Sequence, residues 1–158
     1  MRLILFTTFL LLSNLVHSAS LTAGSKSVGI KLGGASIGPE NYSIAGVSIN
    51  YFALDNLAIG AGYEYWFSGK PTLSKATVDS TYYIPASEQL KPYFGLLYSH
   101  YFVEDNADID AYGYRIGIAY IKSPVFFSAG IRQEKYTSDR AIFSNDDATA
   151  EFMIGFSF

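Results

Sequence analysis

Hydrophobic residues alternate with small or polar residues along most of this chain, and the alternation is clearest at its end. From residue 148 onward, one face carries Phe152, Ile154, Phe156 and Phe158, while the other carries small and polar residues that include Glu151. Successive side chains of a β-strand point to opposite sides, so the pattern predicts a strand with one apolar face. The unpaired edge of such a strand would favour aggregation, whereas the last strand of a closed barrel pairs with the first. The segment therefore predicts a closed barrel.

Seven earlier segments show the same alternation. They span about residues 27–33, 42–53, 57–67, 77–84, 93–102, 112–120 and 125–134. Most have the length of roughly ten residues that a tilted strand needs to cross a bilayer. The fourth segment is the weakest, and the fifth is apolar on both faces, so its orientation stays open. The predicted fold is all-β: an eight-stranded antiparallel transmembrane up-and-down β-barrel.

The predicted links between these segments alternate in length. They lie at about residues 38–41, 55–56, 68–75, 87–91, 104–111, 122–123 and 138–147, and the odd-numbered links tend to be longer and more polar. Bacterial outer-membrane barrels combine short periplasmic turns with longer outer loops. A soluble lipocalin-like barrel is the alternative, but it would place apolar residues inside around a ligand. Here the face with glycine and charged residues has to be the inner one, because charges such as Arg132 are unfavourable against lipid.

Aromatic residues on the predicted outward face gather near the strand ends. We expect one group at the outer end, comprising Tyr63, Tyr65, Phe67, Tyr82, Tyr112 and Tyr114. We expect a second group at the periplasmic end, comprising Tyr51, Tyr120, Phe127, Phe156 and Phe158. Amphipathic rings at both rims would fix the depth of the barrel in the bilayer.

The start of the chain has the composition of a secretory signal. Arg2 precedes an apolar stretch over residues 3–12, and small residues follow near Ser18. The pattern predicts a cleavable signal peptide at residues 1–18 and a barrel domain at residues 19–158. The alternative is a transmembrane anchor, but the apolar stretch is too short to span comfortably.

Composition and charge narrow the possible partners. The chain contains no cysteine, which excludes a lipid-anchored lipoprotein and any disulfide framework. Without Arg2, the 11 basic residues become 10 against 14 acidic ones, a net charge of −4. Binding of nucleic acid requires a basic patch, so we expect no nucleic-acid partner.

Three segments carry a resemblance to a known family. Residues 56–65 (NLAIGAGYEY), residues 91–95 (KPYFG) and residues 151–158 (EFMIGFSF) resemble small OmpA/OmpX-type β-barrel domains. The resemblance implies an integral protein of the cell outer membrane, a monomer in contact with outer-membrane lipids and lipopolysaccharide. It also implies that the barrel-assembly machinery recognises Phe152, Ile154, Phe156 and Phe158. The implied role is structural or surface-interacting, with no cofactor.

Seven charged residues are expected on the inner face. They are Lys31, Glu64, Asp79, Arg115, Arg132, Glu134 and Glu151. An eight-stranded barrel is just wide enough for its own side chains to fill, so we expect the three cations and four carboxylates to pair. We interpret the set as a structural salt-bridge plug. The resemblance to OmpA-like barrels keeps a small gated pore as the alternative.

Some eight-stranded outer-membrane proteins are lipid-modifying enzymes, so a catalytic site has to be considered. His100 is the only histidine after the predicted signal, and Ser99 beside it points to the opposite face. A serine nucleophile needs an imidazole within hydrogen-bond reach, so we expect no catalytic residues and no enzyme activity. The acidic segment at residues 104–110 lacks the glycine and closing glutamate of a calcium loop, so we expect no metal site there. The remaining interpretations are a solvated loop or one that shares divalent cations with lipopolysaccharide.

Overall fold

The computed structural model describes residues 21–37, 40–137 and 148–158, and the regular elements in this part of the chain are strands. The strands are β1 (Lys26–Ile37), β2 (Glu40–Leu54), β3 (Leu57–Phe67), β4 (Leu73–Tyr83), β5 (Leu90–Val103), β6 (Ile109–Lys122), β7 (Val125–Tyr136) and β8 (Ala148–Ser157). No helix among these residues is long and apolar enough to cross a membrane. The predicted signal peptide lies outside the described residues.

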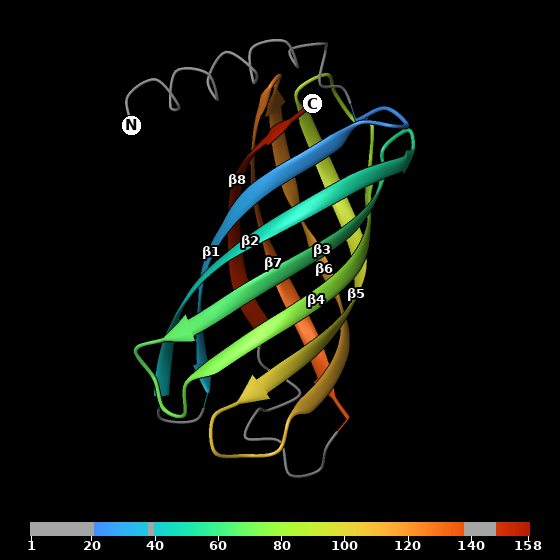
Figure 1. The fold of residues 1–158 in the computed structure, drawn as a ribbon. Coiled ribbons are helices and arrows are strands. Elements are labelled where there is room, and N and C mark those ends of the chain that lie inside the picture. Colours follow the sequence, from blue (N-terminus) through green and yellow to red (C-terminus); the bar gives the residue numbers. More distant parts are fainter. Residues whose placement is uncertain (1–20, 38–39, 138–147) are drawn as a thin grey trace, which may run out of the picture.

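The eight strands form a closed barrel in which every strand pairs antiparallel with the next and β8 pairs with β1. Figure 1 shows tilted strands that wrap around a common axis, with the C-terminus and the start of β1 at the same end. We call this the terminal end and the opposite one the loop end. At the terminal end, the amide of Lys26 donates to the carbonyl of Phe158 (2.7 Å) and the amide of Phe158 donates to the carbonyl of Lys26 (2.8 Å). The predicted barrel class is therefore confirmed.

Exposure alternates along each strand as the sequence pattern predicts. In β8, every second residue from Ala148 to Phe158 is exposed and the residues between are buried. In β5, whose orientation the pattern left open, Phe94, Leu96 and Tyr98 face outward while Tyr93 and Tyr101 are buried inside. The apolar character of both faces of β5 thus reflects two environments, an outer surface and a packed interior.

Two predictions about strand ends are wrong. The fourth strand begins at Leu73 and not near Thr77, and it runs from the loop end to the terminal end. Tyr82 pairs with Leu57 and Phe94, so it lies at the terminal end and not in the outer group of aromatic residues. The length rhythm of the links is also weaker than predicted, because the link between β4 and β5 at residues 84–89 is one residue longer than each of the described loop-end links at residues 68–72 and 104–108.

The interior of the barrel contains an apolar cluster at each end. The loop-end cluster consists of Tyr42, Ile44, Trp66, Leu73, Tyr101, Val103, Ile109 and Ala111. The terminal-end cluster consists of Leu21, Phe52, Ala58, Tyr83, Tyr93, Ala119, Ile121, Phe126 and Met153. Aromatic rings pack edge to face in the loop-end cluster, where the Trp66 centroid lies 5.8 Å from that of Tyr101. The sequence analysis did not predict these clusters, because it identified the inner face by its glycine and charged residues.

Candidate functional site

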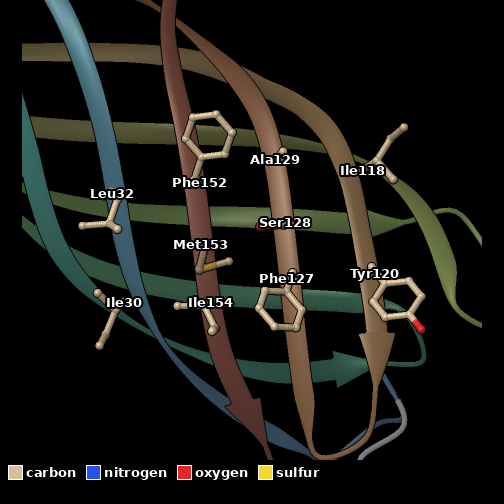
Figure 2. Close-up of a pocket in the computed structure, with 10 residues that line it drawn as sticks. All are labelled: Ile30, Leu32, Ile118, Tyr120, Phe127, Ser128, Ala129, Phe152, Met153 and Ile154. Atoms are coloured by element: carbon tan, nitrogen blue, oxygen red, sulfur yellow. The ribbon is translucent and has the colours of Figure 1, made fainter.

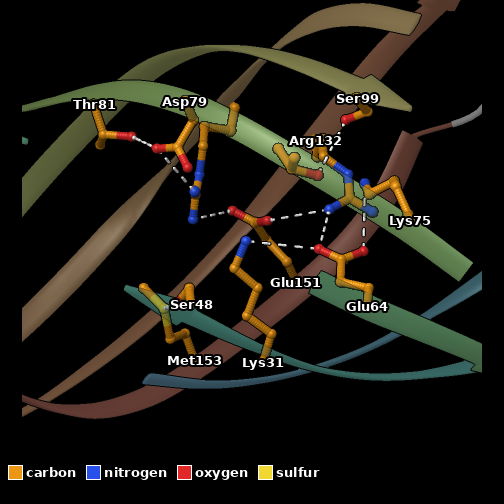
Figure 3. A network of polar contacts seen from close by, with 12 residues as sticks. Lys31, Ser48, Glu64, Lys75, Asp79, Thr81, Ser99, Arg132, Glu151 and Met153 are labelled. Atoms are coloured by element: carbon orange, nitrogen blue, oxygen red, sulfur yellow. Dashed lines mark hydrogen bonds and ion pairs between the residues drawn. The ribbon is translucent and has the colours of Figure 1, made fainter. Parts of the chain in front are cut away.

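The seven charged residues expected on the inner face all lie inside the barrel. None of them is more than 7% exposed. They occupy the layer between the two apolar clusters. Figure 3 labels five of them, and their side chains converge from strands on different sides of the wall: Lys31, Glu64, Asp79, Arg132 and Glu151. The arrangement follows from alternation, since each of these residues stands at an inward position of its strand.

Sequence reasoning missed an eighth member of this layer, Lys75. Its side chain is fully buried, and its Nζ lies 3.2 Å from Glu134 Oε2 and 3.3 Å from Glu64 Oε2. The ammonium group also lies 5.2 Å from the centre of the Tyr101 ring, within the range of a cation–π interaction. Lys75 was placed in a link because the fourth strand was started too late. Continuing the alternation of Thr77 and Asp79 back by two residues would have found it.

Arg132 is the most connected residue of the layer. Its Nη1 lies 2.8 Å from Glu64 Oε1 and 3.8 Å from Glu151 Oε2, and its Nε lies 3.0 Å from Glu134 Oε2. A guanidinium group presents several N–H donors in a fixed plane, so one arginine can contact three carboxylates that approach it from different directions. Arg132 therefore links β3, β7 and β8 across the interior (Figure 3).

Arg115 holds the other half of the layer. Its Nη2 lies 2.8 Å from Glu151 Oε1 and its Nη1 lies 3.5 Å from Asp79 Oδ2. Each of these carboxylates also accepts a hydrogen bond from a hydroxyl group: Tyr93 donates to Glu151 (3.3 Å) and Thr81 donates to Asp79 (2.8 Å). Because Glu151 contacts both arginines, the two halves form one network.

The network is electrically balanced among the described residues. Lys31, whose Nζ lies 3.6 Å from Glu64 Oε1, brings the cations to four: Lys31, Lys75, Arg115 and Arg132. The carboxylates are also four: Glu64, Asp79, Glu134 and Glu151. Removing a charge from water costs several kcal/mol unless opposite charges and hydrogen bonds replace the lost solvation. Four cations and four carboxylates at inward positions of the strands supply those opposite charges to one another.

The residues considered for catalysis do not come together. Ser99 is buried in the barrel, where its hydroxyl lies 3.2 Å from that of Thr77, while His100 lies on the outer face. The imidazole Nδ1 of His100 lies 2.7 Å from Asp110 Oδ1, and Tyr98 donates to the same carboxylate oxygen (2.7 Å). Among the described residues, the polar groups around His100 are thus carboxylates and a phenol, with no serine hydroxyl beside it.

Two carboxylates of the acidic segment after β5, those of Asp108 and Asp110, contact other residues of the protein. Asp108 lies near His100, with Oδ2 3.5 Å from Nε2, and its other oxygen accepts a hydrogen bond from the amide of Val103 (3.4 Å). Asp110 is engaged by Tyr98 and His100. In the part of the chain that the structure describes, no group of three or more His, Cys, Asp or Glu residues is placed to hold a metal ion.

The outer face of the barrel has the opposite character. Large apolar side chains are exposed all around it, among them Ile30, Ile49, Ile59, Leu96, Ile118 and Phe152. A surface of this kind is unfavourable in water, and closure of the barrel satisfies its backbone hydrogen bonds without solvent. With charges inside and an apolar surface outside, the protein is a transmembrane β-barrel of the small outer-membrane type.

Comparison with solved structures agrees with this class. The N-terminal β-barrel domain of Pseudomonas aeruginosa OprF has a TM-score of 0.71 at 16% sequence identity, covering 86% of this chain and 98% of that chain. Neisserial surface protein A (NspA) has a TM-score of 0.59 at 16% identity, covering 84% and 94%. No protein-family model and no curated protein matches the chain.

A structure from the de novo design of transmembrane β-barrels is also similar. It has a TM-score of 0.62 at 16% identity and covers 88% of this chain and 99% of that chain. A designed sequence therefore has the same fold at the same level of identity as the natural barrels. The similarity establishes the fold, and the role of this protein has to be argued from its own residues.

Proposed function

We propose that this protein is an integral outer-membrane barrel with a structural or surface-interaction role, and that its lumen is closed to ions and solutes. The observation that carries this proposal is the balanced charge network between two apolar clusters. A hydrated ion entering from either end would first have to displace buried aromatic rings such as Trp66 or Tyr93. It would then meet charges that already satisfy one another, such as Arg132 and Glu64.

Conductance measurements test the closed lumen. We expect purified wild-type protein, reconstituted in planar bilayers, to give no large, steady channels. We expect an Arg132→Ala or Glu151→Ala variant to lose stability without gaining a steady conductance, because the two apolar clusters remain in place. Large, steady channels from wild-type protein would contradict the proposal.

A small gated pore is the second candidate, and one observation favours it. Arg132 contacts three carboxylates at once, so exchange among these partners would rearrange the network without leaving the arginine unpaired. Brief openings that become longer in Glu64→Gln, a variant that removes one partner's charge, would support this candidate. Their absence at any applied voltage would support the closed barrel.

A lipid-modifying activity is the least supported function, because the surroundings of His100 contain Asp108 and Asp110 and no adjacent nucleophile among the described residues. We expect His100→Ala to leave the masses of lipid A unchanged in cells that express it. A shift in those masses relative to wild type would identify an enzyme.

The proposed partners follow from the surface. Outer-membrane lipids and lipopolysaccharide would contact the apolar face, and the barrel-assembly machinery would recognise Phe152, Ile154, Phe156 and Phe158, which are exposed on β8. We expect a monomer.

A surface role agrees with the description of NspA as a surface protein. Increased detergent sensitivity of a deletion strain would indicate a role in membrane integrity, whereas unchanged sensitivity would favour surface interaction.

A further inference from the structure

An apolar groove of about 520 Å³ crosses the outer face of β6, β7, β8 and β1. Its floor is at Ala129, which pairs with Ile118 on one side and with Phe152 on the other (Figure 2). Figure 2 shows the rings of Phe127 and Phe152 standing beside the groove, and Ile30 and Leu32 extend its wall onto β1. The groove exists because a small side chain lies among large ones that all point toward lipid.

The groove lies toward the terminal end of the barrel. Ala129 is four residues from Val125, which pairs with Lys122 at the turn between β6 and β7. Four residues of strand span about 14 Å, or about 10 Å along the membrane normal at the usual tilt of barrel strands. This depth is less than half of the hydrocarbon thickness of about 30 Å. The groove therefore faces the acyl chains of a single leaflet.

Two exposed lysines border the same leaflet at the terminal end. Lys122 continues the outward series of Ile118 and Tyr120 on β6, and Lys26 continues that of Val28 and Ile30 on β1. Neither forms an ion pair within the described part of the chain. Lysine side chains at such positions extend their ammonium groups to the polar interface. The two cations thus stand on β6 and β1, the first and last of the four strands that carry the groove.

We propose that this groove holds one acyl chain of an anionic glycerophospholipid whose phosphate is bound by Lys122. The apolar lining at Ala129 accepts the chain, and the distance to Lys122 matches a lipid of the leaflet at the terminal end. Lys122 selects a negative headgroup, because an ammonium group binds phosphate with a charge-assisted hydrogen bond, and Lys26 adds positive charge beside the same leaflet. The proposal rests on the position of the barrel in a membrane and not on a closed lumen, so the conductance and lipid-binding results are independent.

Native mass spectrometry of the detergent-purified protein tests this site. The probes are phosphatidylglycerol and phosphatidylcholine with identical palmitoyl and oleoyl chains. We expect one phosphatidylglycerol molecule to be retained in preference to phosphatidylcholine, and Lys122→Gln to reduce that preference. Ala129→Phe should raise the Kd for phosphatidylglycerol, obtained from lipid occupancy at several lipid concentrations, by about fourfold, the effect of excluding one methylene group from an apolar site. Ala129→Leu should give a smaller increase in the same Kd.

Ala61→Phe is the matched control. Ala61 is also an exposed alanine on the lipid-facing side, but it pairs with Ile49 and Val78 on β2 and β4, away from the groove. It should leave lipid occupancy unchanged, and heat-dependent gel mobility verifies that each variant is folded. Equal occupancy in the Ala129→Phe and Ala61→Phe variants would overturn the proposal, as would equal retention of the two lipids by the wild type. A dimer that Ala129→Phe dissociates would overturn it in favour of a second copy in the groove.

Discussion

At the scale of single residues, Arg132 has the largest expected effect on stability. Replacing it with alanine leaves Glu64 and Glu134 buried with less positive charge nearby. Breaking a buried ion pair by removing one partner costs about 3–5 kcal/mol. We therefore expect Arg132→Ala to lower the free energy of unfolding by that amount. Urea unfolding in phospholipid vesicles, followed by the fluorescence of Trp66, the only tryptophan of the chain, measures it.

Lys135→Ala is the control for this prediction. Lys135 is on the same strand, three residues further along, but its side chain is exposed on the outer face. Surface substitutions usually change stability by less than about 0.5 kcal/mol. Equal losses for the two variants would show that Arg132 contributes no more than a surface cation.

Gly130 tests how tightly the interior is packed at one position. A Cβ on this residue would collide with the hydroxyl of Tyr93 and with the carbonyl oxygen of Ile116. At Gly34, by contrast, the nearest atom to an added Cβ is the carbonyl oxygen of Tyr42 at an ordinary 3.6 Å. Overpacking costs about 1–3 kcal/mol, so we expect that loss for Gly130→Ala and little change for Gly34→Ala in the same unfolding measurement. Similar stability of both variants would show that Tyr93 moves aside freely.

At the scale of strands, β8 closes the barrel and carries the proposed assembly signal. Phe158→Ala should reduce the amount of folded protein in the outer membrane of cells, because it removes one of the four aromatic and aliphatic residues that we propose the assembly machinery recognises. Phe94→Ala on β5 is the control, since Phe94 is exposed on the lipid side to a similar extent, 47% against 42%. The two variants should refold equally well from urea into detergent. An equal reduction in the amounts of the two variants in cells would show that Phe158 contributes no more to assembly than another lipid-facing phenylalanine.

The strands also show what sequence alone can predict. Alternation identified the barrel and the inward position of Arg132, because the period of two fixes which side chains share a face. It failed at the start of β4, where the weak pattern of small residues hid Lys75. It also failed for the apolar clusters inside, because Tyr101 and Phe126 are as hydrophobic as residues that face lipid. Only the register between strands distinguishes these two environments.

At the scale of the whole molecule, closure of the barrel leads us to expect resistance to detergent. Hydrogen bonds join all eight strands in a ring, so no strand edge is available for stepwise opening. We expect unheated protein to migrate on a dodecyl sulfate gel at a different position from heated protein. A chain truncated after residue 147, which lacks β8, should migrate at one position under both conditions. A single position for the intact chain would contradict a stable closed barrel.

The charge balance inside the barrel also determines how charge is distributed between its two ends. Because the buried network sums to zero, the net charge of the described residues resides at the two ends of the barrel. At the loop end, the described residues include five carboxylates (Glu40, Glu104, Asp105, Asp108 and Asp110) against two lysines (Lys70 and Lys135). At the terminal end, three lysines (Lys26, Lys91 and Lys122) exceed two carboxylates (Asp55 and Glu88). The barrel is thus an electric dipole aligned with its own axis, with its negative pole at the loop end.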